Sequence, residues 1–276
     1  MTDRPYTRRV FYISDRTGIT AETFGHTLLT QFGSSQFKAQ TLPFIDSIDK
    51  ANRAVKKINK AGDEDSIRPL VFSTLVDQEV KEIIASSNCM VIDFFDAFIG
   101  LLEQELNTSS SHAAGLSHGM GNDNDYLDRI DALNYTLAND DGASTKNYPT
   151  AQIILIGASR TGKTPTSLYL ALRYGIWTAN YPLAGDDIHS EYLPDVLKPY
   201  RSKLFGLTIN PERLHLIRQQ RRPNSEYASL KRCKTETRAI ETIYHHEGIP
   251  YADTSQMSIE EITTFIMHKM KLKRTL

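Results

Sequence analysis

An eight-residue loop limits, more than any other feature, what this chain can fold into. Residues 157–164 read Gly-Ala-Ser-Arg-Thr-Gly-Lys-Thr and match the pattern G-x-x-x-x-G-K-[ST] in full. The apolar run Gln152–Ile156 precedes the loop, and Lys163–Tyr174 follows it with apolar residues at helical spacing. A strand, a glycine-containing turn and a helix in this order are typical of a parallel α/β sheet. The sequence therefore predicts an α/β fold with this loop at the end of a strand.

The residue types of the loop indicate phosphate binding. Two glycines allow a tight turn whose backbone N–H groups point at phosphate oxygens. Lys163 would reach the terminal phosphates of a nucleotide, and the hydroxyl of Thr164 would bind Mg²⁺. An ordinary glycine-containing turn is the alternative, and the flanking strand and helix speak against it. We expect the nucleotide-binding residues to be Gly157, Ala158, Ser159, Arg160, Thr161, Gly162, Lys163 and Thr164.

Candidates for the other catalytic roles are less specific. Arg160 could fold toward a transferring phosphoryl group as an internal arginine finger, or it could be a solvated loop arginine. No aspartate ends an apolar strand of this half in the manner of a Walker-B residue. Asp186 and Asp187 follow the segment ANYPLAG and are candidates for metal or base work, although turns also favour aspartate.

Short apolar runs alternate with amphipathic stretches in both halves of the chain, a pattern that predicts crossover connections and parallel sheets. The predicted strands are Val10–Ser14, Gln40–Ile45, Leu70–Leu75, Met90–Phe95, Gln152–Ile156, Ile176–Tyr181, Leu204–Ile209 and Ile249–Ala252. The predicted helices are Thr20–Gln31, Ile48–Lys60, Asp77–Ser86, Tyr126–Ala138, Lys163–Tyr174, Pro211–Arg221, Ser229–Glu247 and Ile259–Lys271. The fold class is therefore α/β, with two halves that each hold a mostly parallel sheet.

A polar stretch separates the two halves. Residues 107–125 read NTSSSHAAGLSHGMGNDND, and only Leu116 and Met120 are large and apolar, so burial would not offset the entropy of ordering this stretch. We interpret it as a linker or a mobile loop. The domains are then an N-terminal α/β domain at 1–106 and a P-loop kinase-like nucleotide-binding domain at 126–276.

Composition excludes several classes of function. The 276 residues include 32 Lys plus Arg and 33 Asp plus Glu, which gives no reason to expect nucleic-acid or acidic-membrane binding. The two cysteines, Cys89 and Cys233, form no C-x-x-C pair, and no H-E-x-x-H is present, so a zinc site is not expected. No apolar run has the length of a signal peptide or a membrane span. We therefore expect a cytoplasmic protein.

Two further clusters allow both a functional and a structural interpretation. The segment SDRTGITAE at 14–22 lies at a strand-to-helix junction, where it could bind an anion with the help of Arg16 or simply cap a helix. The stretch 213–234 is rich in Lys and Arg, and Arg218 and Arg222 share a helical face that could clamp phosphate. A solvated helix face is the alternative there. The glycine-rich loop, HRD and DFG signatures of protein kinases are missing.

Five segments together carry a resemblance to a known family: FYISDRTGITAET, RPLVFSTLV, RIDALNYTLANDDG, GASRTGKTPTSLYLALRYGIWTANYPL and KLFGLTINPERLHLIRQQRRPNSEYASLKRC. In content, order and spacing they resemble the bacterial phosphoenolpyruvate synthase regulatory proteins, which are relatives of the pyruvate, phosphate dikinase regulatory proteins. The likeness covers almost the whole chain. The last segment is more similar to the synthase-regulating branch.

The resemblance implies a bifunctional enzyme. Such proteins phosphorylate a threonine of phosphoenolpyruvate synthase with ADP as donor, which inactivates the synthase. They also remove that phosphate by attack of inorganic phosphate and release pyrophosphate. The resemblance places ADP at the loop 157–164. Lys163, and Arg160 if it folds inward, would then offset charge on the β-phosphoryl group.

Four carboxylates, none preferred over the others, are candidates for the base in that reaction: Asp15, Asp140, Asp141 and Asp187. The partners implied are the synthase, ADP and inorganic phosphate, with Mg²⁺ as cofactor. A homodimer is compatible with the sequence, which does not give the oligomeric state. The alternatives are a small-molecule P-loop kinase, which would not explain the SDRTGITAE cluster, and a non-catalytic nucleotide-sensing module.

Overall fold

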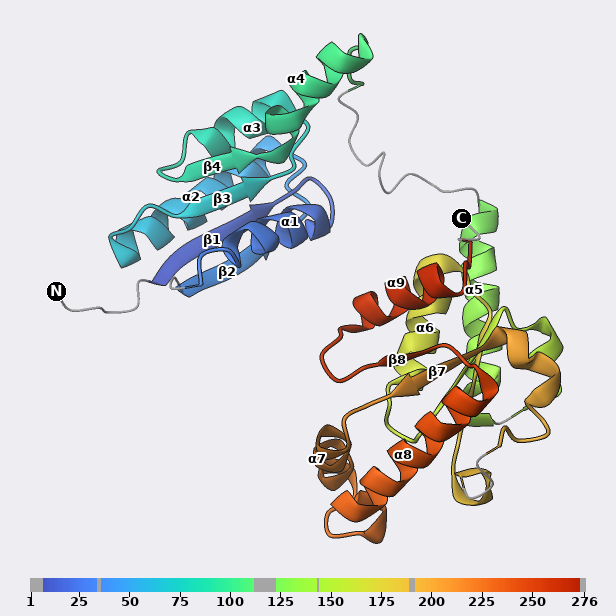
Figure 1. Ribbon diagram of the computed structural model, residues 1–276. Helices are drawn as coiled ribbons and strands as arrows, with labels where there is room; N and C mark the ends of the chain where they lie inside the picture. Colours follow the sequence, from blue (N-terminus) through green and yellow to red (C-terminus); the bar gives the residue numbers. More distant parts are fainter. Residues whose placement is uncertain (1–6, 34–35, 112–122, 143, 189–191, 274–276) are drawn as a thin grey trace. The chain divides into compact units, whose positions relative to one another are not determined.

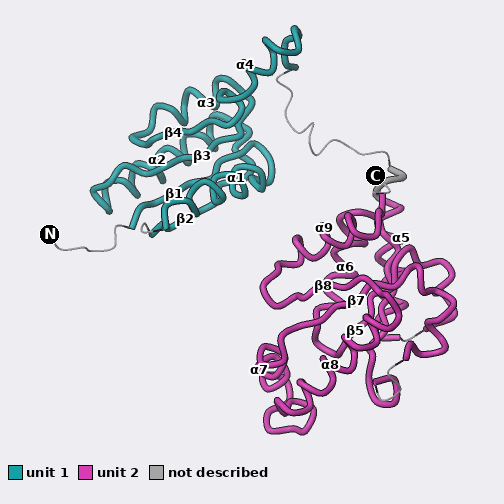
Figure 2. Tube along the Cα trace, in the orientation of Figure 1, with its two compact units in different colours: residues 1–119 teal, residues 120–276 magenta. Residues whose placement is uncertain are grey.

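The chain folds into two compact units, residues 1–119 and 120–276 (Figure 2). The computed structural model describes residues 7–33, 36–111, 123–142, 144–188 and 192–273. Each unit contains a four-stranded parallel sheet with helices on it, as the α/β prediction requires. Of the predicted linker at 107–125, residues 112–122 lie outside the described residues.

Unit 1 has the strand order β2-β1-β3-β4. Its strands are β1 Thr7–Ile13, β2 Gln36–Leu42, β3 Leu70–Ser73 and β4 Met90–Asp93. Its helices are α1 Ile19–Leu29, α2 Ile48–Asp65, α3 Gln78–Ala85 and α4 Phe94–Leu106. Two apolar clusters form the core of the unit. In one the sheet packs against α2 and α3, and in the other it packs against α1 and Phe94. The helices therefore cover both faces of the sheet (Figure 1).

Two elements of unit 1 differ from the sequence prediction. The strand expected at Gln40–Ile45 lies at Gln36–Leu42; it ends before Pro43, which cannot donate a backbone hydrogen bond. The strand expected to reach Phe95 ends at Asp93, and the helix α4, which was not predicted, begins directly after it. The Asp93 carboxylate accepts hydrogen bonds from the backbone N–H groups of Phe95 and Asp96 and so caps this helix. The apolar pair after Asp93 thus starts a helix although it has the composition of a strand.

Unit 2 has the strand order β6-β5-β7-β8. Its strands are β5 Ile153–Gly157, β6 Thr178–Pro182, β7 Leu204–Thr208 and β8 Tyr251–Asp253. Its helices are α5 Asp123–Ala138, α6 Lys163–Tyr174, α7 Pro211–Arg221, α8 Leu230–Glu247 and α9 Ile259–Lys269. Short 3₁₀ segments connect them at η2 Asp140–Gly142, η3 Tyr148–Thr150, η4 Gly185–Ile188, η5 Lys198–Lys203 and η6 Glu226–Ala228. The predicted helices Lys163–Tyr174 and Pro211–Arg221 are confirmed at both ends.

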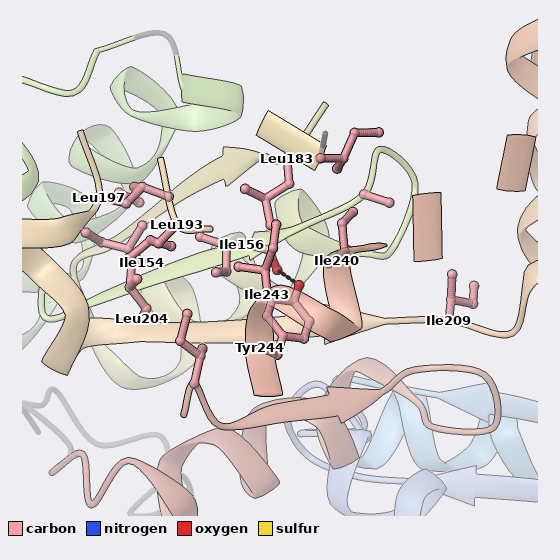
Figure 3. Close-up of a cluster of buried hydrophobic side chains, with 14 of the residues drawn as sticks. Ile154, Ile156, Leu183, Leu193, Leu197, Leu204, Ile209, Ile240, Ile243 and Tyr244 are labelled. Atoms are coloured by element: carbon pink, nitrogen blue, oxygen red, sulfur yellow. Dashed lines mark hydrogen bonds between the residues drawn. The ribbon is translucent and has the colours of Figure 1, made fainter. Parts of the chain in front are cut away.

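Strand β5 is the buried centre of unit 2. All five of its residues are buried, because apolar clusters pack against both faces of the sheet. Ile154 and Ile156 face one cluster together with Leu204, Ile243 and Tyr244 (Figure 3). Each such fully buried aliphatic side chain contributes roughly 1.5–3 kcal/mol. The strand therefore gives the loop that follows it a rigid base.

The two sheets share one topology. In each, the first strand lies between the second and the third, and the fourth strand is at the edge. In such sheets the connections leave the first and third strands toward opposite faces, which opens a crevice at the carboxyl ends of these strands. The loop 157–164 follows β5 and therefore begins at this point of unit 2.

Candidate active site

Three residues with left-handed backbone give the loop 157–164 its shape. Gly157, Arg160 and Gly162 have φ values of 155°, 78° and 92°. A Cβ atom on Gly157 would lie 2.4 Å from the backbone oxygen of Leu207, so only glycine allows β5 and β7 to approach this closely. Gly162 is the N-cap of α6 and uses no side chain to cap it. The free N–H groups of the first helical turn therefore remain available to an anion.

The side chain of Lys163 is folded into this loop. Its Nζ donates hydrogen bonds to the backbone oxygens of Gly157, at 3.2 Å, and Ala158, at 2.9 Å. Lys163 is only 4% exposed, and burial lowers its pKa to about 8, partly opposed by the nearby carboxylates of Asp141 and Asp140. A buried ammonium group whose hydrogen-bond partners are neutral carbonyl groups would gain strongly from an anionic ligand.

Asp140 contacts the threonine of the loop. The Oγ1 atom of Thr164 donates a hydrogen bond of 2.9 Å to Oδ1 of Asp140. The side-chain amide of Asn180, which is buried on β6, donates to the same oxygen. Asp140 belongs to η2, a segment that packs against β6, and the backbone N–H of Asn180 donates to the backbone oxygen of Asn139. The carboxylate that faces the loop thus comes from the segment before β5 rather than from the end of a neighbouring strand.

The neighbouring residue Asp141 has a different environment. Its backbone N–H donates a 2.8 Å hydrogen bond to Oδ1 of Asn180, and its φ of 49° is left-handed. The residue is exposed. The negative charge of its carboxylate is one of the causes that raise the pKa of Lys163, against the lowering by burial.

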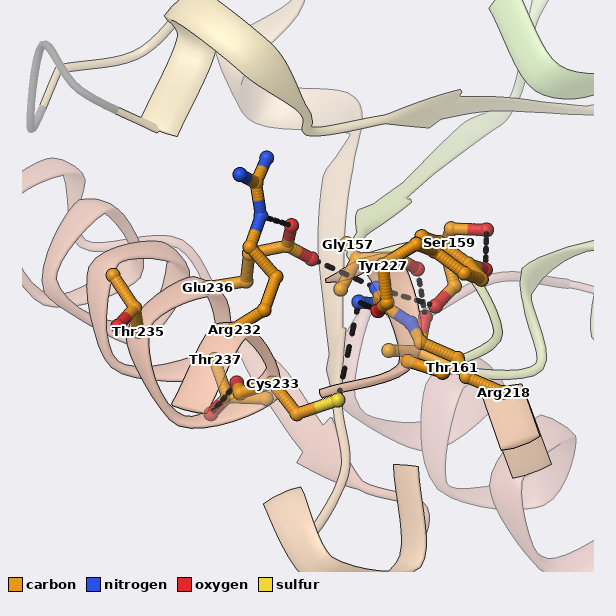
Figure 4. Close-up of polar contacts among 12 residues, drawn as sticks. Gly157, Ser159, Thr161, Arg218, Tyr227, Arg232, Cys233, Thr235, Glu236 and Thr237 are labelled. Carbon is orange, nitrogen blue, oxygen red and sulfur yellow. Dashed lines mark hydrogen bonds and ion pairs between the residues drawn. The ribbon is translucent and has the colours of Figure 1, made fainter. Parts of the chain in front are cut away.

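Arg218 contacts the loop at Ser159 (Figure 4). Its side chain is fully buried and forms a 2.8 Å ion pair with Glu236. One guanidinium nitrogen donates to the backbone oxygen of Ser159 at 3.1 Å, and the guanidinium carbon lies 4.2 Å from the ring centroid of Tyr227. Arg218 therefore fits neither the phosphate clamp with Arg222 nor the solvated helix face that the sequence suggested, since Arg218 is buried and only Arg222 is exposed.

Further hydrogen bonds hold the two ends of the loop. The hydroxyl groups of Ser159 and Tyr227 lie 2.9 Å apart. The hydroxyl of Tyr244 lies 2.9 Å from the backbone oxygen of Ile156, and burial raises its pKa well above the ordinary value. Thr254, after β8, donates to the backbone oxygen of Thr161 at 3.2 Å. The loop is thus fixed by the elements around it before any ligand binds.

The remaining predicted residues lie elsewhere. Asp187 is in η4 after β6, where its carboxylate accepts a 3.2 Å hydrogen bond from the hydroxyl of Tyr181. Asp15 belongs to unit 1, where it follows β1 and lines a cavity of about 420 Å³ with Arg16, Phe44 and Asp77. Of the four candidate bases, the structure brings Asp140 into contact with the loop in unit 2, and Asp141 is the next residue of the same segment. The tight turn Asn-Asp-Asp-Gly at 139–142 was visible in the sequence, but its distance from the loop along the chain gave no sign of this contact.

The fold and the loop define the class of the protein. It is an α/β protein with a P-loop sequence at the switch point of a parallel sheet. The kinase/pyrophosphorylase family matches residues 10–267, and the chain belongs to this family.

Curated relatives cover nearly the full length. A protein from Alkalilimnicola ehrlichii is 52% identical over 269 residues, which cover 98% of each chain. One from Neisseria meningitidis serogroup B is 50% identical and covers 97% of this chain and 98% of its own. One from Halorhodospira halophila is 50% identical and covers 99% of both. All three bear the name "Putative phosphoenolpyruvate synthase regulatory protein". The resemblance to the synthase regulatory proteins is thereby confirmed.

Among the described residues, no helix is both long enough and apolar enough to cross a membrane.

Proposed function

We propose that this protein is a bifunctional threonine kinase and phosphorylase that regulates phosphoenolpyruvate synthase. The names of its full-length relatives support the target. The observation that carries the chemistry is the arrangement of three side chains at one loop. The buried ammonium group of Lys163 donates to the loop backbone, and the hydroxyl of Thr164 donates to the carboxylate of Asp140. These are the groups that position and neutralise a phosphoryl group during transfer.

In the kinase direction, ADP binds with its phosphates on the loop 157–164. The threonine oxygen of the synthase forms a bond to the β-phosphorus, the bond from this phosphorus to the bridging oxygen breaks, and AMP leaves. The threonine proton passes to a carboxylate. Lys163 exchanges its hydrogen bonds to the backbone oxygens of Gly157 and Ala158 for bonds to phosphate oxygens. We assign Arg160, a residue of the loop with a left-handed φ of 78°, to the charge on the transferring group.

In the phosphorylase direction, the same site accepts the phosphothreonine. An oxygen of inorganic phosphate forms a bond to the phosphorus, the bond to the threonine oxygen breaks, and pyrophosphate leaves. The threonine oxygen takes up a proton. In each of the two reactions, the N–H groups at the start of α6 and the ammonium group of Lys163 offset the negative charge on the phosphoryl group that is transferred.

The residues at the loop also fit Mg²⁺. No three His, Cys, Asp or Glu side chains gather into a metal site within the part of the chain that the structure describes. Mg²⁺ commonly uses only one or two protein oxygens and completes its shell with phosphates and water. Thr164 and Asp140, whose oxygens are 2.9 Å apart, are the groups that would hold it. The ion would offset charge on the phosphates.

The test uses the purified full chain, purified phosphoenolpyruvate synthase and ADP labelled at the β-phosphate. We expect label on a synthase threonine, loss of synthase activity, and release of labelled pyrophosphate when unlabelled phosphate is added. Lys163→Ala should abolish transfer, whereas Lys269→Ala, which changes an exposed lysine of α9, should not. Transfer to a metabolite in place of the synthase would favour a small-molecule kinase. Binding of ADP without any transfer would favour a nucleotide sensor.

A further inference from the structure

Ser159, the third residue of the loop 157–164, is held by two residues from outside the loop. Its backbone oxygen accepts a 3.1 Å hydrogen bond from Nη2 of Arg218 on α7, and its hydroxyl lies 2.9 Å from the hydroxyl of Tyr227 in η6 (Figure 4). The backbone oxygen of the preceding residue, Ala158, instead accepts from Nζ of Lys163 at 2.9 Å. Consecutive carbonyl groups of the loop thus have different partners, one within the loop and one on α7.

The contact at the Ser159 carbonyl group also sets the direction of the next N–H group. In a planar trans peptide, the C=O of one residue and the N–H of the following residue point in opposite directions. Because the Ser159 oxygen points to Arg218, the backbone N–H of Arg160 points away from α7. No acceptor for this N–H is found among the residues that the structure describes, and Arg160 has a left-handed φ of 78°. Free N–H groups in such turns can bind an anion.

Arg218 is a costly residue if its role is only to stabilise the fold. It is fully buried, and its charge is balanced by Glu236 at 2.8 Å. Nη1 donates to the backbone oxygen of Tyr227, but Nε–H has no hydrogen-bond partner in the described part of the chain. An apolar pair of similar volume often stabilises a core as well as a buried ion pair or better, and a buried donor without a partner costs free energy. The contact that an apolar pair could not replace is the one with Ser159.

We propose that Arg218 is a positioning residue that directs the backbone N–H of Arg160 toward a phosphate oxygen of bound ADP. The inference rests on the proposed function, because it requires ADP on the loop 157–164. Arg218 does not touch the nucleotide and acts through the carbonyl group of Ser159, while Glu236 holds the guanidinium group in place. Loss of this contact should therefore weaken ADP binding and leave the affinity for the synthase unchanged.

The experiment removes the arginine together with its buried partner, so that no buried charge is left unpaired. In the full chain, Arg218→Met with Glu236→Leu is compared with the matched control Arg201→Met with Glu247→Leu. Arg201 also donates to a backbone oxygen and pairs with Glu247 at 3.0 Å, but it lies in η5, before the amino end of β7. For the first variant we expect ADP affinity to fall and the KM for ADP to rise by about tenfold, with the KM for the synthase unchanged. The control should change neither.

NMR of the protein with isotope-labelled arginine follows the N–H group itself. The signal that disappears in Arg160→Lys identifies the backbone amide of Arg160. We expect this amide proton to shift downfield when ADP binds to the wild type or to the control, as it does when an N–H donates to an anion, and we expect the shift to be lost without Arg218. A purely structural role of Arg218 would lower the midpoint of urea denaturation but leave this shift in place.

The outcomes separate this inference from the proposed function. If the wild type transfers no label to the synthase, the proposed function fails. If the wild type is active and the variant without Arg218 keeps its ADP affinity or the shift of Arg160, the positioning role alone is overturned. Should this variant not fold, Arg218→Lys is measured in the same way. It keeps a positive charge opposite Glu236 but lacks the planar fork that reaches Glu236 and Ser159 together, so the same losses are expected.

Discussion

Gly18 and Gly162 occupy equivalent positions in the two units. Each is the N-cap of the helix that follows the first strand of its sheet, with φ and ψ of 81° and 0° at Gly18 and 92° and 11° at Gly162. The surrounding residues are Arg-Thr-Gly-Ile-Thr at 16–20 and Arg-Thr-Gly-Lys-Thr at 160–164. With the shared strand order, this makes unit 1 a structural counterpart of unit 2.

The counterpart in unit 1 lacks the residues that phosphate binding requires most. Ile13 stands where unit 2 has Gly157, and Ile19 stands where it has Lys163. Asp15 adds a negative charge at the position of Ser159. The P-loop chemistry is therefore expected of unit 2 alone, although the helix after the first strand begins at a left-handed glycine in both units.

The two glycines should respond differently to substitution by alanine. Both positions carry a left-handed φ, which costs a residue with a Cβ atom roughly 1–2 kcal/mol. At Gly18 the new Cβ would also lie 2.7 Å from Cγ2 of Thr41, whereas at Gly162 it would meet open space. Gly18→Ala should therefore lower the free energy of unfolding more than Gly162→Ala, as measured by urea denaturation. Only Gly162→Ala should weaken ADP binding, and equal losses of stability would contradict the contact with Thr41.

The stability of unit 2 should depend on pH through Lys163. Because burial lowers the pKa of this lysine from 10.5 to about 8, the unfolded chain binds more protons than the folded chain between these pH values. Stability therefore rises with pH across this window. Lys163→Met should remove this dependence. Since a shift of one pKa unit corresponds to about 1.4 kcal/mol, the free energy of unfolding should change by roughly 3 kcal/mol across the window. Urea denaturation of both proteins at pH 7, 8.5 and 10 measures the free energy of unfolding. If it changes with pH equally in the two proteins, the pKa of Lys163 is not lowered.

The same lysine links ADP binding to pH. Only the charged form of Lys163 attracts phosphate, so the affinity for ADP should fall as the pH rises above about 8. At pH 8–9, binding should take up protons, because the anion restores the charge. Calorimetry in two buffers of different ionisation enthalpy measures this uptake. The matched variant Arg173→Ala, on the exposed face of α6, should leave it unchanged.

The sequence predicts the P-loop region well because all its signals are local. The apolar run of β5, the glycines and the helical spacing of α6 lie within about twenty consecutive residues, and periodicity detects such patterns. The prediction misplaces β2 and misses α4, since an apolar pair after Asp93 has the composition of a strand. The cap at Asp93 determines that a helix begins here, and this cap depends on the fold of the residues that follow it.

The rest of the site could not be predicted because its contacts join distant segments. Asp140 reaches Thr164 only through the docking of η2 on β6, and no periodicity encodes that contact. Arg218 has the spacing of an exposed basic face, yet Glu236 and the Ser159 carbonyl bury it. The similarity of residues 16–20 and 160–164 is visible in the sequence, but a match of five residues is too short to indicate a structural relationship. The relationship becomes clear only because both segments follow the first strand of their sheet and the two sheets have the same topology.

The buried pair of Arg218 and Glu236 should be costly to break. Arg218→Met leaves the Glu236 carboxylate, which is 7% exposed at its side chain, with Arg232 as its remaining ion-pair partner. We expect a loss of about 3–5 kcal/mol in the free energy of unfolding. The double variant Arg218→Met with Glu236→Leu should recover a large part of it, because no buried charge is then unpaired. Additive losses in this double-mutant cycle would show that the two side chains do not interact.

Asn180 holds both aspartates of η2, so its substitution by aspartate should act through charge. In Asn180→Asp, a second carboxylate faces Asp140 in place of the donating amide, and the repulsion should lower stability at pH 7 by about 2–4 kcal/mol. Like charges raise the pKa of the pair in the folded state. The folded variant therefore binds more protons than the unfolded one, and its deficit relative to the wild type should shrink as the pH falls from 7 to 5. Asn180→Leu is the matched control, because it removes the same hydrogen bonds without adding charge, and its deficit should not change over that range. Urea denaturation at each pH measures both, and a deficit of Asn180→Asp that stays constant would place the new carboxylate away from Asp140.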